Sequence, residues 1–203
     1  MKQVDKNHYD FMKYSHEGRW VSYFYQLKEV LALNPQSILE AGCGDKVFAS
    51  FIKNTTHIRY SSLDIAEDLD PDIRGSLDSI PCPDGSYDVV CAFEVLEHIP
   101  FESFERCLQE MKRVARTHVC ISIPHFGPSF EFLLKIPLLK RCRFAFKIPY
   151  HPKHAFNGEH YWELGKKGHS PAKIRSVIVK HFEIKKEFVP FGNQYHHFYI
   201  LKK

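Results

Sequence analysis

Two glycines that follow a short apolar run are the part of this sequence most closely tied to chemistry. Residues 37–41 (Ser-Ile-Leu-Glu-Ala) form an apolar strand that leads directly into Gly42-Cys43-Gly44. A strand that turns through glycines into a helix brings its backbone close to any ligand above the sheet edge, where a Cβ would block the approach. The pattern predicts a ligand-binding turn.

Asp64 indicates which part of a ligand this turn faces. It lies 20 positions beyond Gly44, at the end of the expected second strand, where a carboxylate can accept hydrogen bonds from both hydroxyls of a ribose. The dinucleotide fingerprint GxGxxG requires glycine at position 47, which is Val47, and the phosphate-loop motif GxxxxGK[ST] is absent. The sequence therefore favours a nucleoside ligand and disfavours a nicotinamide oxidoreductase.

A series of motifs resembles class I S-adenosylmethionine-dependent methyltransferases, most closely the small type 11 group. The series covers about residues 36–124 and consists of Glu40-x-Gly42-x-Gly44, Leu63-Asp64, Ser79-Ile80-Pro81-Cys82-Pro83-Asp84-Gly85-Ser86-Tyr87-Asp88-Val89-Val90 and Glu94-Val95-Leu96-Glu97-His98-Ile99. The resemblance implies S-adenosyl-L-methionine as cofactor and S-adenosyl-L-homocysteine as product. The chain departs from the family at Lys46, where a small residue is usual, and this change would make the methionine end of the pocket tighter or more cationic.

The resemblance also implies which residues hold the cofactor. The turn would border the methionine and sugar, Asp64 would hold the ribose, and the residues after the second and third strands would border adenine. Phe93 and Glu94 would line the methyl-donor end. The cofactor-binding candidates are Glu40, Ala41, Gly42, Cys43, Gly44, Asp64, Ile65, Ser76, Leu77, Asp78, Phe93 and Glu94.

Histidines are the candidates for proton transfer. Methyl transfer from a sulfonium is an in-line displacement, which needs a general base only if the acceptor carries a proton. His98 follows the expected fourth strand, His125 follows the fifth, and His160 lies in a segment expected to cover the site. We take these three as candidate catalytic residues. None of the cysteines forms a CxxC pair, and no metal site is expected.

The elements that position these residues alternate between strands and helices, which predicts an α/β sandwich. The resemblance implies a Rossmann-like, mostly parallel seven-stranded sheet of order 3-2-1-4-5-7-6 with its last strand antiparallel. We expect one domain over residues 1–203, beginning with an N-terminal helical segment at 1–34. Strands are expected at 37–41, 58–65, near 73–77, 87–93, 118–123, 182–189 and 195–202, and helices at 19–33, 46–54, 101–116 and 171–181.

Residues 125–169 do not fit this alternation. The segment is rich in Phe, Pro and cations, and long insertions of this kind are usually lids or binding loops. We expect an insertion after strand 5, in which residues 126–162 form a lid over the acceptor side. Within it, 130–148 combines Phe and Leu with Lys and Arg, and a basic amphipathic helix of that composition can rest on an anionic membrane.

The net charge of +4 is divided unevenly along the chain, with −6 on residues 1–124 and +10 on residues 125–203. Basic character attracts nucleic acid, anionic lipid and acidic small molecules alike. The (Asn/Asp)-Pro-Pro-(Tyr/Phe) signature of amino-directed nucleic-acid methyltransferases is absent, so no sequence-specific nucleic-acid partner is expected. We predict a cytoplasmic protein, because the N-terminus is polar, no apolar run is long enough to span a membrane, and the six cysteines are interpreted as reduced. Peripheral contact with a membrane is a further option.

Two functions remain open at this point. The first is an S-adenosylmethionine-dependent methyltransferase acting on a small-molecule or lipid-like acceptor. The alternative is a non-catalytic methyltransferase-like domain that binds a nucleoside or a protein, and Lys46 is the residue that favours it.

Overall fold

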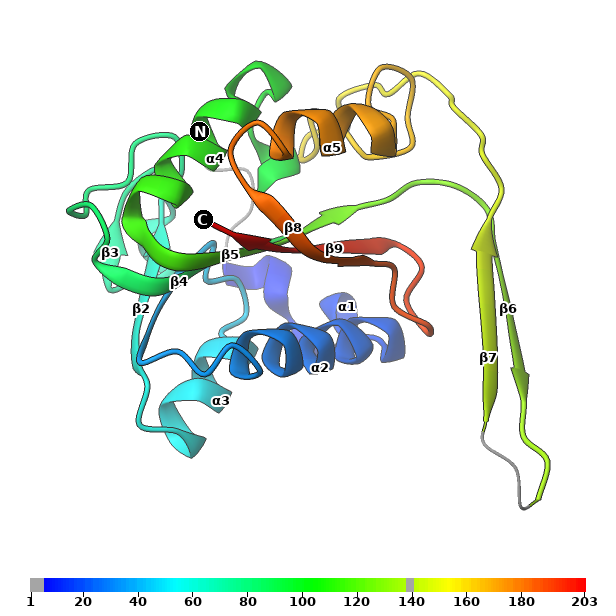
Figure 1. The fold of residues 1–203 in the computed structure, drawn as a ribbon, viewed down its shortest axis with the longest axis horizontal. Coiled ribbons are helices and arrows are strands. Elements are labelled where there is room, and N and C mark those ends of the chain that lie inside the picture. Colours follow the sequence, from blue (N-terminus) through cyan, green and yellow to red (C-terminus); the bar gives the residue numbers. More distant parts are fainter. Residues whose placement is uncertain (1–5, 138–140) are drawn as a thin grey trace.

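A seven-stranded sheet lies at the centre of the computed structural model, which describes residues 6–137 and 141–203 (Figure 1). Its order is β3-β2-β1-β4-β5-β9-β8, and β9 runs antiparallel to both of its neighbours. Because β6 and β7 lie outside this sheet, the order of its own strands is the expected 3-2-1-4-5-7-6. The strands are β1 (Ser37–Ala41), β2 (Arg59–Asp64), β3 (Ile73–Arg74), β4 (Tyr87–Phe93), β5 (Ala115–Pro124), β8 (Glu183–Phe188) and β9 (His196–Lys202).

Helices cover both faces of the sheet (Figure 1). On one face lie α2 (Glu17–Leu31) and α3 (Val47–Thr55), and on the other α4 (Phe104–Val114) and α5 (Pro171–Ile178). Successive strand residues point to opposite faces, so Ile38 packs in the cluster with Val30 and Ile52 of the first layer, whereas Leu39 packs in the cluster with Leu108 of the second. Strands buried on both faces explain the uninterrupted apolar runs in the sequence.

Local sequence signals account for the helix positions. Ser170 caps α5 by accepting a hydrogen bond from the Lys173 backbone at 3.2 Å, and Pro171 fits the first helical turn. The apolar side chains of α4 recur at helical spacing and are buried. Cys91, Cys107 and Cys120 are fully buried free thiols, which agrees with their interpretation as small core residues.

Two expected elements are shorter in the structure. The strand near 73–77 spans only Ile73–Arg74, because the chain turns at once and Ser76 bridges to Ser79. The helix expected at 101–116 begins at Phe104, after a 3-10 turn over Phe101–Ser103, and ends at Val114, where β5 already begins.

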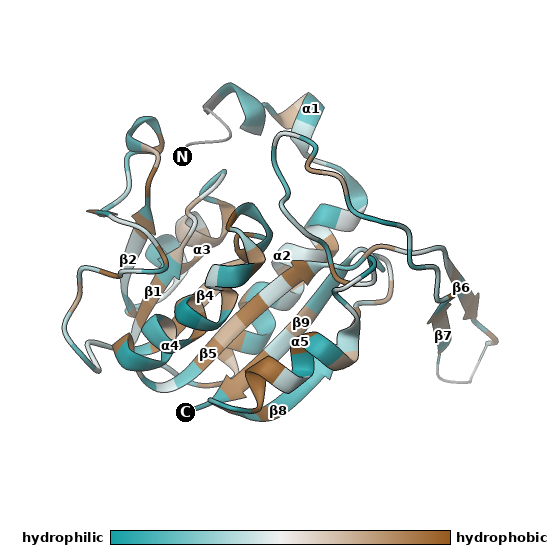
Figure 2. Ribbon diagram, turned by 90° about the horizontal axis from the view of Figure 1, so that it is seen from above, coloured by the Kyte–Doolittle hydropathy of each residue, from teal (hydrophilic) through white to brown (hydrophobic). Residues whose placement is uncertain are grey.

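The expected basic helix within 130–148 is wrong. This segment contains β6 (Ser129–Leu134) and β7 (Cys142–Lys147), which pair as an antiparallel hairpin that projects away from the body of the protein (Figures 1 and 2). The period-two alternation of Phe130, Phe132 and Leu134 suits a strand with one apolar face. The hairpin does not cover the sheet edge, so the expected lid does not extend over all of 126–162. Residues 138–140 lie outside the described part of the chain.

The N-terminal segment contributes more than a long helix. A 3-10 turn over Lys6–Tyr9 and a short helix, α1 (Phe11–Tyr14), precede α2. Among the helices in the described residues, none has the length and apolar character needed to cross a membrane.

Candidate functional site

A cavity of about 440 Å³ opens at the carboxyl ends of β1, β2 and β4. Pockets of this size take small molecules and cofactors, and this edge is where open α/β sheets bind ligands. Ten of the twelve residues expected to hold a cofactor line it: Ala41, Gly42, Gly44, Asp64, Ile65, Ser76, Leu77, Asp78, Phe93 and Glu94.

The glycine turn brings the backbone against the cavity as expected. Gly42 has a φ of +81°, and a Cβ at this position would lie 2.2 Å from Cγ2 of Val95. Both the dihedral angle and the close approach therefore require glycine. The Lys46 ammonium reaches the Asp70 carbonyl at 3.0 Å, and Lys46 does not border the cavity. The expected tightening of the pocket by Lys46 is thus not seen.

Asp64 is held in place by the backbone around it. Its Oδ2 accepts a hydrogen bond from the Cys43 N–H at 3.1 Å, and its Oδ1 accepts one from the Ala66 N–H at 2.8 Å. Each carboxylate oxygen can accept a further hydrogen bond, and the residue borders the cavity. A fixed carboxylate with this remaining capacity fits the two hydroxyls of a ribose.

Glu40 and Cys43 lie behind the turn and do not line the cavity, contrary to expectation. The Glu40 carboxylate is buried and accepts a hydrogen bond from the Tyr60 hydroxyl, and burial raises its pKa to about 8. The Cys43 thiol is also buried, and burial raises its pKa to about 12. Both side chains therefore point into the protein behind the turn and away from the cavity.

Glu94 also lines the cavity. It follows β4 with a φ of +55°, an uncommon conformation for a residue with a side chain. Its Oε2 lies 3.4 Å from Nε2 of His196, and burial raises the pKa of the carboxyl group to about 8. Backbone strain of this kind persists only where the surrounding structure holds it, and it often marks a functional site.

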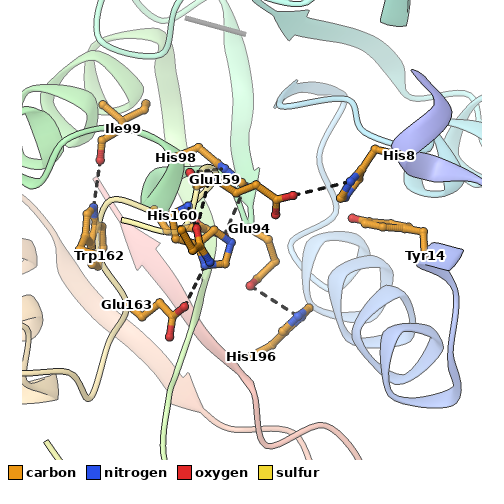
Figure 3. Close-up of polar contacts among 12 residues, drawn as sticks. His8, Tyr14, Glu94, His98, Ile99, Glu159, His160, Trp162, Glu163 and His196 are labelled. Atoms are coloured by element: carbon orange, nitrogen blue, oxygen red, sulfur yellow. Dashed lines mark hydrogen bonds and ion pairs between the residues drawn. The ribbon is translucent and has the colours of Figure 1, made fainter. Parts of the chain in front are cut away.

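His98 and His160 lie against each other, as Figure 3 shows. Their rings are 5.0 Å apart in an edge-to-face arrangement, and His98 itself borders the cavity. Nδ1 of His98 lies 3.1 Å from the Glu159 carbonyl oxygen, and Nδ1 of His160 lies 3.0 Å from Oε1 of Glu163. Burial lowers the pKa of His98 to about 4, so its imidazole is neutral near pH 7.

His125 lies elsewhere, which contradicts its assignment to the catalytic site. Its ring stacks on His197 of β9 with centroids 5.1 Å apart, and it does not border the cavity. Its backbone N–H bonds to the Tyr195 carbonyl at 2.6 Å. The antiparallel pairing of β5 with β9, which sequence reasoning did not use to orient this side chain, places it against the last strand.

Three tyrosines border the cavity, and sequence reasoning did not select the two that come from the N-terminal segment. Tyr9 and Tyr14 come from the N-terminal segment and Tyr161 from the insertion. The two segments approach each other where Nδ1 of His8 lies 3.9 Å from Oε1 of Glu159 (Figure 3). The only sequence signal for Tyr9 and Tyr14 was the density of aromatic residues near the N-terminus, because the four-residue helix α1 is too short to show a periodic pattern.

Comparisons with known proteins agree with this geometry. Residues 39–121 match the family model described as "Methyltransferase domain", and no curated protein sequence shows a significant match to the chain. The match covers the motif series and confirms its resemblance to class I S-adenosylmethionine-dependent methyltransferases.

Solved structures of the same architecture include two enzymes with S-adenosylhomocysteine bound. Magnesium protoporphyrin IX methyltransferase from Synechocystis PCC 6803 is 15% identical with a TM-score of 0.60, over 92% of this chain and 84% of that one. The 1,6-didemethyltoxoflavin-N1-methyltransferase of Burkholderia thailandensis is 12% identical with a TM-score of 0.61, over 96% and 85%. The PH0226 protein of Pyrococcus horikoshii OT3 is 12% identical with a TM-score of 0.61, over 98% and 99%. At these identities the likeness establishes the fold.

Proposed function

Since residues 39–121 form a class I S-adenosylmethionine-dependent methyltransferase domain, we propose that this chain transfers a methyl group to a small-molecule or lipid-like acceptor. The observation that carries the proposal is the cavity, because the Gly42 turn and Asp64 line the same space as Glu94 and His98. A single space therefore connects the expected cofactor site with polar groups suited to an acceptor.

The residues present fit the cofactor. The Asp64 carboxylate would hold the ribose hydroxyls, and the turn at Gly42, which no residue with a Cβ could form without displacing Val95, would lie against the sugar and the methionine portion. Ile65 and Leu77 offer apolar contact for adenine. When bound, S-adenosylmethionine supplies an activated methyl group on a sulfonium.

The surroundings of the cavity support a small acceptor. Tyr9 and Tyr14 border it from the N-terminal segment, and Tyr161 borders it from the insertion. The contact of His8 with Glu159 joins the two segments beside it. Aromatic walls suit planar or apolar molecules, and two of the structurally similar proteins are small-molecule methyltransferases, one for a porphyrin and one for a toxoflavin precursor.

The projecting hairpin supports a lipid-like acceptor presented at an anionic membrane. Cross-strand partners Phe130 with Phe146 and Phe132 with Phe144 share one face of the hairpin, and all four rings are exposed. The opposite face bonds to the body of the protein, since Glu131 accepts a hydrogen bond from the Gly192 N–H. The apolar face therefore points outward, and the exposed cations Lys135 and Arg141, which follow β6 and precede β7, match the charge of anionic lipid.

Transfer of a labelled methyl group tests the proposal. Purified protein and labelled S-adenosylmethionine are incubated with separate small-molecule, lipid and RNA pools, and Asp64→Ala serves as the cofactor-site control. We expect label in the small-molecule or lipid pool with wild type and much less with the variant. Binding of S-adenosylhomocysteine without transfer to any pool would instead favour the non-catalytic alternative.

Vesicle sedimentation tests the membrane surface separately. We expect wild type to bind vesicles that contain phosphatidylserine more strongly than neutral ones, and the double variant Phe132→Ser/Phe144→Ser to lose this binding. Burial of each ring is worth at least about 1.5 kcal/mol, so the double variant should bind roughly a hundredfold more weakly. Phe24→Ser, at an equally exposed phenylalanine of α2, is the matched control. Equal binding by all forms would remove the membrane from the proposal.

A further inference from the structure

Three side chains with metal-ligating atoms converge beside the cavity. Glu97, His98 and His160 each offer a ligand atom within 4.8 Å of the other two. The first two are neighbours in a 3-10 turn over Leu96–His98, and the third comes from the insertion, some 60 residues away in sequence. The hydrogen bond from the Tyr161 N–H to the Glu97 carbonyl, at 2.8 Å, ties the two segments together at this point.

Hydrogen bonds orient both imidazoles. Nδ1 of His98 lies 3.1 Å from the Glu159 carbonyl oxygen, and its Nε2 lies 3.9 Å from Oε1 of Glu97. Nδ1 of His160 lies 3.0 Å from Oε1 of Glu163, which leaves Nε2 as its nitrogen for a ligand. A histidine that binds a metal almost always coordinates it through one ring nitrogen and hydrogen-bonds the other ring nitrogen to a carbonyl or carboxylate oxygen. In this cluster the second nitrogen faces a carbonyl oxygen in His98 and a carboxylate oxygen in His160.

One oxygen of the buried Glu97 carboxylate lacks a hydrogen-bond partner among the described residues. Its side chain is 1% exposed, and Oε2 has no hydrogen-bond partner within the described part of the chain. A buried carboxylate without a partner is costly, and a cation is one of the few groups that offset the cost.

From these contacts we propose that Glu97, His98 and His160 bind a divalent transition-metal ion, of which Zn²⁺ is the natural probe. Two imidazoles and one carboxylate match the ligand sets of catalytic zinc sites and of other first-row metals, and such sets leave coordination positions open. His98 also borders the cavity, so an ion held here adjoins that space. This metal site is separate from the proposed methyl transfer, and ion binding can be measured without any transfer activity.

Metal titration of the stripped protein tests the site. Zn²⁺ binding is followed by competition with a chromophoric chelator and by the rise in unfolding temperature that an ion bound only to the folded state produces. The visible absorption of bound Co²⁺ reports the geometry of its ligands. The variants are Glu97→Gln and His160→Gln at the site and His57→Gln, an exposed histidine between α3 and β2, as the matched control.

We expect wild type and His57→Gln to bind one ion per chain, and the two site variants to bind at least tenfold more weakly. Glu163→Gln should weaken binding about 10- to 100-fold, because it removes the partner that orients His160. Calorimetry with S-adenosylhomocysteine shows whether each variant keeps its cofactor pocket, so failure of the metal site and failure of the methyltransferase function give different results. No ion in wild type, or the same affinity in wild type and His160→Gln, would overturn the proposal.

Discussion

Replacement of Asp64 by alanine tests the cofactor pocket at its best-defined polar group. The carboxylate accepts the N–H groups of Cys43 and Ala66 at 3.1 and 2.8 Å, which fixes its position before any ligand arrives. In our proposal it also accepts two ribose hydroxyls. The substitution therefore removes both ligand contacts and leaves two backbone N–H groups without their acceptor.

The expected loss of affinity follows from the charge on the acceptor. A hydrogen bond to a charged group is worth about 1.5–3 kcal/mol, and about 1.4 kcal/mol corresponds to a factor of ten. Asp64→Ala should weaken S-adenosylhomocysteine binding at least about tenfold, and roughly a hundredfold if one bond contributes its full value. Isothermal titration calorimetry measures this difference directly, and urea unfolding measures the accompanying loss of stability.

Asp72 provides the matched control for this experiment. Its Oδ2 accepts hydrogen bonds from the Ser62 N–H and hydroxyl, both at 2.9 Å, so it supports the backbone of β2 as Asp64 does. It does not border the cavity. We expect Asp72→Ala to lower stability and leave affinity within a few fold of wild type. If Asp64→Ala binds as tightly as wild type, or if both variants lose affinity equally, the ribose role of Asp64 is refuted.

Three further substitutions test other parts of the structure. Gly42→Ala should abolish detectable S-adenosylhomocysteine binding in calorimetry and lower the unfolding midpoint, because its Cβ would lie 2.2 Å from Val95 at a φ of +81°; unchanged affinity would mean that the turn does not touch the ligand. Folded Glu40 keeps a proton up to a pKa of about 8, against an ordinary 4.5, so its contribution to stability is full below pH 4.5 and is lost as the pH rises towards 8. Glu40→Gln should therefore flatten the pH dependence of unfolding by up to about 1.4 kcal/mol per pH unit in that interval, and equal slopes would contradict the assignment. Trp162→Ala should cost about 3–5 kcal/mol in urea unfolding, because the indole is fully buried and donates to the Ile99 carbonyl at 3.0 Å; a loss below about 1 kcal/mol would show that the insertion is not anchored there.

The sheet and the meeting of the glycine turn with Asp64 were predictable because their signals are local. Apolar runs such as Tyr87–Phe93 specify buried strands, and the motif containing Gly42 and Gly44 follows its strand without a gap. Asp64 ends β2, and parallel pairing of β1 with β2 brings it beside the turn. Because neighbouring parallel strands end at one edge, strand order was enough to bring these residues together.

The direction of a side chain was less predictable than its place in the sheet. Glu40 and Cys43 sit in the right motif but point into the protein, where burial raises the pKa of each. His125 follows its strand as expected but packs on His197. The direction of each of these side chains depends on which elements pack against its position, and the motif alone does not specify that packing.

The sequence by itself determined the layered fold and the glycine–aspartate part of the cavity, since short-range patterns encode both, and the resemblance of its motifs to a known family implied the order of the strands. Only the tertiary structure decided which of the thirteen histidines meet, that the insertion projects as a hairpin, and that His8 reaches Glu159 across the two covering segments. His98 and the Glu159 carbonyl are 61 positions apart, and no periodicity spans that distance. Such contacts form because packing of the sheet fixes where distant loops emerge, so chemistry that depends on them becomes visible only once the chain is folded.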